Sequence, residues 1–384
     1  MVMAVLNQIA FGGSRVAVSL YALELGASQV TIGILVGLYA ICPILLGITI
    51  GRFSDRTLPR LPMILGSAVM IAALLLPPIF YGLPALCITA LMLGLSHPLF
   101  LIPMEAMVGG IGGGTQRVKN YALLSMGWSA ANFLGPVVAG FSIDYIGHRP
   151  VFLVLAAITI PPTLMLCFMP ALLPTVARRI SNETRGSVLD LWRMRPVRST
   201  LIASAIVGAG LDLFQFYFPI YGHSVGLTAS AIGTIIGVVS VAAFIVRGVL
   251  PLVVKWVPEA DTLTYSIFIA AFAFTLLPFF SNPYALAASA FVLGLGVGCA
   301  TPMTMSLLYA LTPAPRVAEA IGLQKTVRNS TQLVIPFVFG NVGAAFGFAA
   351  VFLANAVMLV IGGALVRRAG MRNSEREKNR AGTR

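Results

Sequence analysis

The sequence predicts an all-α integral membrane protein, and three observations lead to this fold class. First, 58% of the 384 residues are apolar, only 10% are charged, and the mean hydropathy is +0.94. A soluble chain of this size cannot bury so many apolar side chains, because its surface takes up too many of its residues. Second, the apolar residues form blocks of about 20 residues, the length of helix that crosses ~30 Å of hydrocarbon. Third, the second half of the chain repeats the first.

The apolar blocks define twelve predicted transmembrane helices. Strands are excluded, because a membrane barrel requires alternating segments of about ten residues. The predicted spans are 1–22, 30–51, 61–82, 84–109, 120–142, 150–173, 199–221, 229–251, 261–280, 283–312, 321–343 and 346–366. They group into an N-terminal six-helix bundle (1–173), a linker (174–198), a C-terminal six-helix bundle (199–366) and a basic tail (367–384).

Basic residues predict the orientation of these helices. The chain has 25 Lys and Arg against 12 Asp and Glu, for a net charge of +13. They lie between apolar blocks and in the tail, so they indicate topology rather than nucleic-acid binding. The loops of one side hold nearly all of them, from Arg52 to the tail, with Lys325 and Arg328 included, whereas the opposite loops hold essentially Arg149 alone. The positive-inside rule therefore places the linker and both termini in the cytoplasm.

An internal repeat relates the two bundles at an offset of about 200 residues. Ile32-Gly33 matches Ile232-Gly233, Leu93-Gly94-Leu95 matches Leu293-Gly294-Leu295, and Val151-Phe152-Leu153 matches Val351-Phe352-Leu353. Many matches at one offset indicate duplication. Six spans per repeat is an even number, so both halves enter the membrane in the same direction and the repeats are parallel. Two such bundles can rock about a shared site, although duplication can also build nothing more than a larger bundle.

The loop after the second predicted span resembles a motif of the major facilitator superfamily. The family pattern there is Gly, three residues, Asp-Arg, any residue, Gly-Arg-Arg. It is matched by Gly51, Asp55, Arg56 and Arg60, whereas Leu58 and Pro59 replace a Gly and an Arg. With the repeat and the linker, the resemblance covers the whole chain. It implies a transporter fold of two parallel six-helix repeats around a central cavity, in which this loop latches the two halves on the cytoplasmic side.

Asp55 is the residue of this loop with a clear physical role. A carboxylate near a helix N-terminus is stabilised by about 0.3–1 kcal/mol through the helix dipole. We expect Asp55 to face the start of the eleventh span, near Gly322. The alternative is a solvated loop charge.

The fifth span carries a Gly-Pro pattern that is similar to part of a motif of exporters in the same family. It contains Gly135, Pro136 and Gly140, and the repeat places Pro336 and Gly340 in the eleventh span. Ala131 stands where the motif requires a further glycine. Small residues allow close helix packing and Pro bends helices, so ordinary packing is the alternative to an efflux signature.

Ionisable residues inside the spans are the predicted transport residues, because charges in hydrocarbon are costly and usually functional. Arg15 and Asp212 lie near the middle of the first and seventh spans. The repeat aligns Asp212 with Gly12, one helical turn from Arg15. We expect the two to meet across the cavity, as a coupling or substrate site or as a permanent ion pair. Gln215, one turn after Asp212, is a further candidate ligand residue.

Two residues of the fourth span complete this set. His97 is a candidate proton relay, since its reference pKa is ~6.5, or it is hydrogen-bonded to nearby backbone. Glu105 lies near the cytoplasmic end. We expect it to pair there with Arg56, Arg60 or Arg328.

These observations favour one function class over two others. The chain has no nucleotide-binding loop, zincin motif or nucleophile elbow, and its four Cys show no metal-ligand spacing. We therefore predict a secondary active transporter without cofactor or metal that works by alternating access. Protons are the expected coupling ion, and efflux is favoured over uptake of a metabolite or organic anion. A transport-inactive receptor or regulatory protein and a membrane-embedded enzyme are the other classes.

The same observations predict the location and the partners of the protein. The protein should be a multi-pass monomer in the lipid bilayer of a bacterial inner membrane. Its expected partners are a small-molecule substrate and protons, and not nucleic acid.

Overall fold

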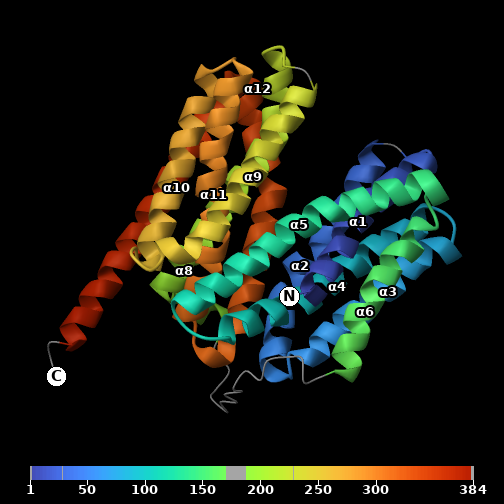
Figure 1. Ribbon diagram of the computed structural model, residues 1–384, viewed down its shortest axis with the longest axis horizontal. Helices are drawn as coiled ribbons and strands as arrows, with labels where there is room; N and C mark the ends of the chain where they lie inside the picture. Colours follow the sequence, from blue (N-terminus) through green and yellow to red (C-terminus); the bar gives the residue numbers. More distant parts are fainter. Residues whose placement is uncertain (1, 28, 170–186, 228, 382–384) are drawn as a thin grey trace. The chain divides into compact units, whose positions relative to one another are not determined.

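The computed structural model describes residues 2–27, 29–169, 187–227 and 229–381, and nearly all of them are helical (Figure 1). The chain forms two compact units. Unit 1 consists of residues 1–111, 126–183 and 313–326, and unit 2 consists of residues 112–125, 184–312 and 327–384.

Every predicted span falls on a helix within the described residues, and residues 170–173 of the sixth span lie outside them. The helices of the first half are α1 (Val2–Glu24), α2 (Gln29–Arg56), α3 (Arg60–Ile79), α4 (Leu83–Gly110), α5 (Thr115–Ile146) and α6 (Val151–Phe168). Those of the second half are α7 (Val188–Arg193), α8 (Arg195–Ser224), α9 (Ala229–Val253), α10 (Glu259–Leu276), α11 (Pro283–Leu311) and α12 (Val317–Ala381). Short 3-10 turns occupy η2 (Leu277–Phe279) and η3 (Ala314–Arg316). The small helix α7 and the start of α8 lie in the predicted linker, and residues 174–186 of the linker lie outside the described residues.

Ten helical segments of the described chain are long and apolar enough to cross a membrane. Helix α1 is not among them, because Asn7, Gln8 and Arg15 lower its hydropathy. The last two predicted spans share α12. Gly347, the second residue of the last predicted span, interrupts α12 with a non-helical φ of 76° and ψ of 179° that a residue with a Cβ rarely adopts.

The duplication is visible in how the helices pack. In unit 1, α4 packs against α2 and α3; in unit 2, α11 packs against α9 and α10 (Figure 1). A Cβ on Gly94 would lie 2.8 Å from the carbonyl oxygen of Tyr39, and one on Gly294 would overlap the carbonyl of Val239. Both contacts fall at the 200-residue offset, so the repeat extends to backbone-to-backbone contacts between equivalent helices. The chain has the predicted two-repeat, all-α membrane architecture.

The two units exchange equivalent segments. Residues 112–125 belong by sequence to the first repeat but cluster with unit 2, and residues 313–326 of the second repeat cluster with unit 1. Val118 and Ala122 are accordingly buried in the hydrophobic core of unit 2. The two segments start and end 201 positions apart, so the exchange follows the internal repeat.

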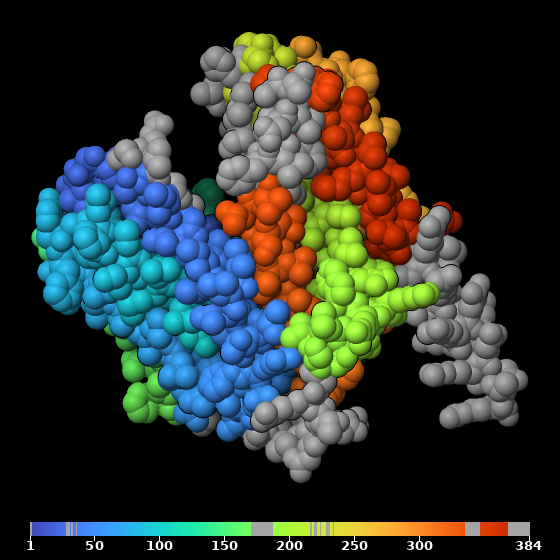
Figure 2. Space-filling model, turned by 180° about the vertical axis from the view of Figure 1, so that it is seen from behind, coloured from blue at the N-terminus to red at the C-terminus, as the bar shows by residue number. Residues whose placement is uncertain are grey.

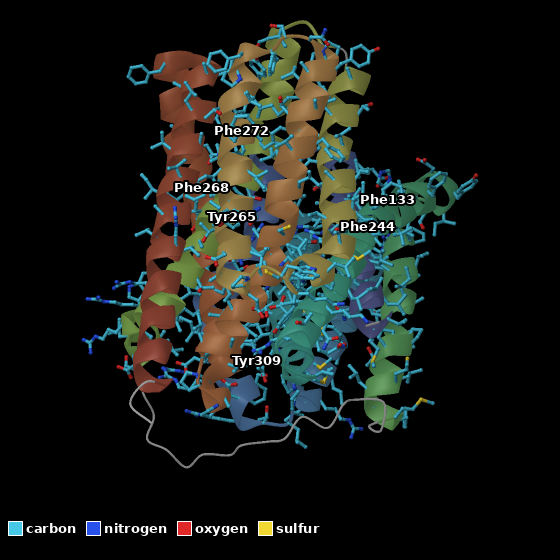
Figure 3. The ribbon with its side chains drawn as sticks, turned by 60° about the vertical axis from the view of Figure 1, so that its left-hand side comes forward. Phe133, Phe244, Tyr265, Phe268, Phe272 and Tyr309 are labelled. Atoms are coloured by element: carbon cyan, nitrogen blue, oxygen red, sulfur yellow. The ribbon has the colours of Figure 1, made fainter. Side chains whose placement is uncertain are left out.

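Apolar side chains cover outer surfaces of both units. Helices α2 and α3, in blue, form much of the surface of unit 1 in Figure 2. Leu45 on α2 is 71% exposed. Figure 3 shows Tyr265 and Phe272 along α10 of unit 2, where both are exposed. Surfaces of this composition are suited to contact with lipid rather than water.

Candidate functional site

Asp55, at the end of α2, caps the start of α12. Its two carboxylate oxygens accept hydrogen bonds from the backbone N–H groups of Ala318 and Glu319, at 2.9 and 2.8 Å. The first N–H groups of a helix have no partner within the helix, and the dipole favours a negative charge there. The contact lies one turn before Gly322. This confirms the predicted position of Asp55, while its gating role stays a prediction.

Glycines bring α2 and α12 together at this point. A Cβ on Gly51 would overlap the carbonyl of Ala318, and one on Gly322 would overlap the carbonyl of Gly47. The two backbones therefore touch at two successive turns, which only residues without a side chain allow. Gly51 of the motif is required for close helix packing, and Gly47 extends the same stripe.

Glu319 adds an ion-pair network beside Asp55. Its carboxylate oxygens lie 2.9 Å from Nε of Arg52 and 2.8 Å from Nε of Arg316. Burial raises the pKa of Glu319, but the hydrogen bonds and charges of Arg316 and Arg52 outweigh burial and hold this pKa below its usual range. Glu319 therefore stays ionised near neutral pH and binds α2 to the start of α12.

The two basic residues of the motif are Arg56 and Arg60. Arg60 donates hydrogen bonds to the carbonyls of Leu166 and Cys167, at the end of α6, where carbonyls lack partners within the helix. Arg56 is exposed at the last position of α2. Arg60 therefore joins helices of the first half.

Glu105 pairs with Lys325, a partner that the sequence did not predict. Its Oε1 lies 2.8 Å from Nζ of Lys325, and the Glu105 side chain is completely buried. The Lys325 ammonium also lies 5.5 Å from the ring of Trp128, a cation–π contact. Sequence analysis missed this partner because it counted Lys325 as a loop charge, whereas Lys325 lies in the third turn of α12. The predicted pairing with Arg56, Arg60 or Arg328 stays a prediction.

Arg15 and His97 lie in unit 1 around Phe11. The guanidinium of Arg15 is 5.8 Å from the ring of Phe11 and 5.6 Å from that of Tyr39, and Arg15 is exposed. His97 stacks on Phe11 at 3.9 Å, and its Nε2 lies 3.0 Å from Oε1 of Gln8. Nε2 of His97 thus hydrogen-bonds a side chain, and not the backbone, which was the predicted alternative.

Asp212 of unit 2 has a cation partner on α12. Its Oδ1 lies 3.8 Å from Nη2 of Arg328, and Gly208, one turn earlier, leaves the space that the guanidinium occupies. The sequence analysis paired Asp212 with Arg15. The two belong to different units, so that pairing stays a prediction, and Arg328 is a partner that it missed.

The neighbours of Asp212 divide into core and surface. Phe214 and Tyr217 are buried, and Phe214 stacks on Phe218 at 4.7 Å, so these aromatic rings pack unit 2. Gln215 is exposed and remains a candidate ligand residue.

The Gly-Pro pattern of α5 provides packing at one of its glycines. A Cβ on Gly135 would lie 2.7 Å from the carbonyl oxygen of Ile9 on α1, which confirms close packing. At Gly140 a Cβ would meet no atom within 4 Å, so the packing predicted there was wrong. Pro136 lies inside α5. Pro336 and Gly340 lie in α12, but their side-chain surroundings are outside the described part of the chain.

Comparison with known sequences decides the family. The profile of the Major Facilitator Superfamily matches residues 1–283 and 261–384. The chain belongs to the Major Facilitator Superfamily. The predicted resemblance is confirmed, and the chain is a secondary transporter of a small molecule. The superfamily is a family of transporters, not a class of enzymes.

Individual members of the superfamily support this assignment. The multidrug resistance protein MdtG of Escherichia fergusonii is 26% identical over 285 residues, with 68% of each chain covered. MdtG of Enterobacter lignolyticus is 27% identical over 301 residues, covering 72% of this chain and 71% of the relative.

Solved structures show the same fold. A bacterial homologue of the iron transporter ferroportin, in an outward-facing state, has a TM-score of 0.82 at 13% identity and covers 96% of this chain and 98% of its own. The human organic anion transporter MFSD10 (TETRAN) has a TM-score of 0.78 at 14% identity and covers 95% and 97%.

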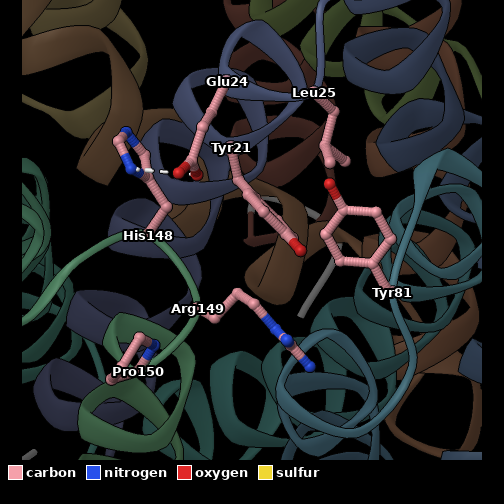
Figure 4. Close-up of a pocket in the computed structure, with 7 residues that line it drawn as sticks. All are labelled: Tyr21, Glu24, Leu25, Tyr81, His148, Arg149 and Pro150. Carbon is pink, nitrogen blue, oxygen red and sulfur yellow. Dashed lines mark ion pairs between the residues drawn. The ribbon is translucent and has the colours of Figure 1, made fainter.

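A pocket at the other end of unit 1 was not predicted. It measures about 370 Å³ and is lined by residues of α1 and of the turns that follow α3 and α5 (Figure 4). Nδ1 of His148 lies 3.0 Å from Oε2 of Glu24. Arg149 donates to the carbonyls of Pro77 and Pro78 and covers the ring of Tyr81 at 5.8 Å. Arg149 thus has a structural role at the end of α3.

The sequence analysis did not recognise three basic residues as charges inside helices. Lys325 and Arg328 were assigned to a loop although both lie in α12. Arg247 was not weighed, although it lies inside the apolar helix α9. The sequence could have identified all three. A charge inside an apolar span is costly and usually functional, and this rule, which selected Arg15 and Asp212, applies equally to these basic residues.

Proposed function

We propose that the chain is a proton-coupled exporter of amphiphilic small molecules that works by alternating access. Two relatives are named multidrug resistance proteins, which supports export of drug-like compounds. The proposed setting is the inner membrane of a bacterium, as a monomer with both termini in the cytoplasm. The latch of Asp55 on α12 would hold the cytoplasmic side closed.

One observation carries the coupling proposal: two acids at membrane depth each pair with a cation of α12. Glu105 pairs with Lys325 in unit 1, and Asp212 pairs with Arg328 in unit 2. The two cations are three residues apart on one helix. Protonation of either carboxylate removes its charge and weakens the pair, so a proton can release α12 from that acid. Alternating protonation would then accompany the change of conformation.

Purified protein in vesicles with an imposed pH gradient tests this proposal. The pH gradient should drive the exchange of protons for a fluorescent amphiphilic cation such as ethidium. The dye should then accumulate against its own concentration gradient. Collapse of the pH gradient with nigericin should abolish accumulation. Glu105→Gln and Asp212→Asn identify the coupling acid, since loss of its proton site should abolish accumulation but leave downhill exchange. Accumulation that survives nigericin would overturn proton coupling, and absence of any flux would favour the transport-inactive alternative.

Arg15 favours an organic anion as the second candidate substrate. Its exposed guanidinium lies beside two aromatic rings, a combination that suits an aromatic carboxylate or sulfonate. Uptake of such an anion should then depend on Arg15. The same vesicles, supplied with a fluorescent aromatic carboxylate, separate the two candidates: Arg15→Gln should abolish anion flux and spare dye export.

A further inference from the structure

Arg247 is the one charged residue of α9. It lies in the last two turns of a helix that is otherwise apolar and long enough to cross the membrane. A guanidinium at this depth is costly unless it finds partners, so its contacts point to a function.

The first partner is a carbonyl that its own helix cannot satisfy. Nε of Arg247 donates to the carbonyl of Gly298 on α11, at 3.2 Å. In a regular helix this carbonyl would accept from the N–H group four residues later, but that residue is Pro302, which has none. Gly298 also lets the two helices touch, because a Cβ there would lie 2.6 Å from Cα of Ala243. Pro302 and Gly298 together create an acceptor within reach of Arg247.

The second partner lies in the exchanged segment. Nη1 of Arg247 donates to the carbonyl of Ser125, at 3.1 Å. Ser125 is the last residue of the 112–125 segment, which comes from the first repeat but belongs to unit 2. Arg247 therefore connects this segment to α9 and α11 of the second repeat.

The repeat shows what Arg247 corresponds to in unit 1. At the 200-residue offset its equivalent is Gly47, which packs against Gly322 in the other exchanged segment, 313–326. In unit 1 the segment is held by a carboxylate, Asp55, that accepts from backbone N–H groups. In unit 2 a guanidinium donates to backbone carbonyls. The two equivalent segments are thus held by side chains of opposite charge, one that accepts hydrogen bonds and one that donates them.

We propose that Arg247 is a positioning residue of the transport cycle, a second lock that holds residues 112–125 in unit 2 and is released when the conformation changes. The lock rests on the proposed alternating access, but its effect on conformation can be measured without transport. Its action through the Ser125 carbonyl distinguishes it from the Asp55 motif, which acts on α12.

Thiol labelling at a distant site tests the lock. The four native cysteines, all free thiols, are replaced by alanine, and Thr326→Cys introduces a reporter in the segment held by unit 1. Arg247→Ala should raise the rate of N-ethylmaleimide labelling at position 326 by about tenfold, the effect expected for loss of the hydrogen bond from the charged guanidinium to the Ser125 carbonyl. Arg247→Lys, which keeps a donor, should restore part of the protection.

Arg149→Ala is the matched control. Arg149 also donates to carbonyls of a proline-containing helix, but Pro77 and Pro78 lie in its own half of the chain, so labelling at position 326 should not change. Equal labelling of the Arg247→Ala and Arg149→Ala proteins would overturn the proposal.

Pro302→Ala covers the case in which Arg247→Ala does not fold. It gives the Gly298 carbonyl an N–H partner within α11 and so competes with Arg247, while alanine suits a helix. Labelling at position 326 should rise severalfold in this folded protein, and unchanged labelling would overturn the lock. Arg247-dependent labelling in a protein without dye flux would refute the proposed export and leave the lock standing.

Discussion

The Asp55 carboxylate accepts two backbone hydrogen bonds from the start of α12, one on each oxygen. The sequence predicted the position of Asp55 because the family pattern and the helix-dipole argument both select this residue. Two oxygen acceptors are needed, since each of the two N–H groups takes one oxygen.

Asp55→Asn should therefore weaken the contact with α12 without unfolding α2. An amide keeps one oxygen acceptor and loses the charge, so the contact should lose about 1.5–3 kcal/mol, the typical range for hydrogen bonds to charged groups. Dye export should slow, and labelling of a Thr326→Cys reporter should rise. Asp144→Asn, which changes an exposed carboxylate on α5, is the control and should leave both readouts as they are. Unchanged labelling in Asp55→Asn would count against the latch.

Glu105 and Lys325 show what sequence could not provide at the residue scale. Both charges were noticed, but their pairing depends on how α4 and α12 are aligned in space, which no spacing in one chain reveals. The same holds for Asp212 and Arg328. Depth in an apolar span predicts that a partner exists, not which residue it is.

The Glu105–Lys325 pair should show strong non-additivity. Lys325→Met leaves the buried Glu105 charge without its ammonium, which should cost about 3–5 kcal/mol. The double variant Glu105→Gln with Lys325→Met removes both charges and should recover most of this loss. Thermal unfolding of the purified protein in detergent measures the series. Equal destabilisation by the single and double variants would show that the pair does not stabilise the fold.

At the scale of the helix, glycines decide where two backbones meet. Gly47 and Gly51 sit one turn apart on α2 and face Gly322 and Ala318 on α12. The sequence marked Gly51 through its motif but gave no reason to select Gly47 among the 38 glycines of the chain. Helix boundaries were also hard to predict: the last two predicted spans follow each other along α12, where the non-helical Gly347 marks a kink between two helices.

Gly51→Ala should separate α2 from α12, because the added Cβ would overlap the Ala318 carbonyl. Overpacking of this kind costs about 1–3 kcal/mol. Gly37→Ala is the matched control on the same helix, since a Cβ there meets no atom within 4 Å. It should be neutral or slightly stabilising, as alanine favours a helix over glycine. Labelling of the Thr326→Cys reporter and melting temperature compare the two; equal behaviour would refute the close contact.

For the whole molecule, duplication was the strongest sequence signal and the one most fully reproduced. Equivalent helices pack through equivalent glycines, as at Gly94 and Gly294. The exchange of residues 112–125 and 313–326 was not predicted. A repeat in sequence shows which segments are alike but not which unit each one packs into, because that depends on contacts between distant parts of the chain.

The structure also changes the charge count behind the predicted topology. Lys325 and Arg328 lie within α12 beside carboxylates, so they no longer count as loop charges. Arg149, the exception on the opposite side, is bound to carbonyls at the end of α3. The remaining loops and the tail still carry a strong basic excess on one side. The positive-inside rule therefore still predicts both termini in the cytoplasm.

Reporter fusions test this orientation. A reporter fused after Arg384 or inserted within residues 181–190 should read cytoplasmic, and one inserted at Gly226 should read external, because an odd number of spans separates Gly226 from each. Arg149→Ala should leave all three readings unchanged, since that residue holds the end of α3 and sets no topology. Lys325→Met should also leave them unchanged, because its charge lies inside a helix. An external reading at Arg384 would contradict the even number of spans and, with it, the parallel arrangement of the two repeats on which alternating access depends.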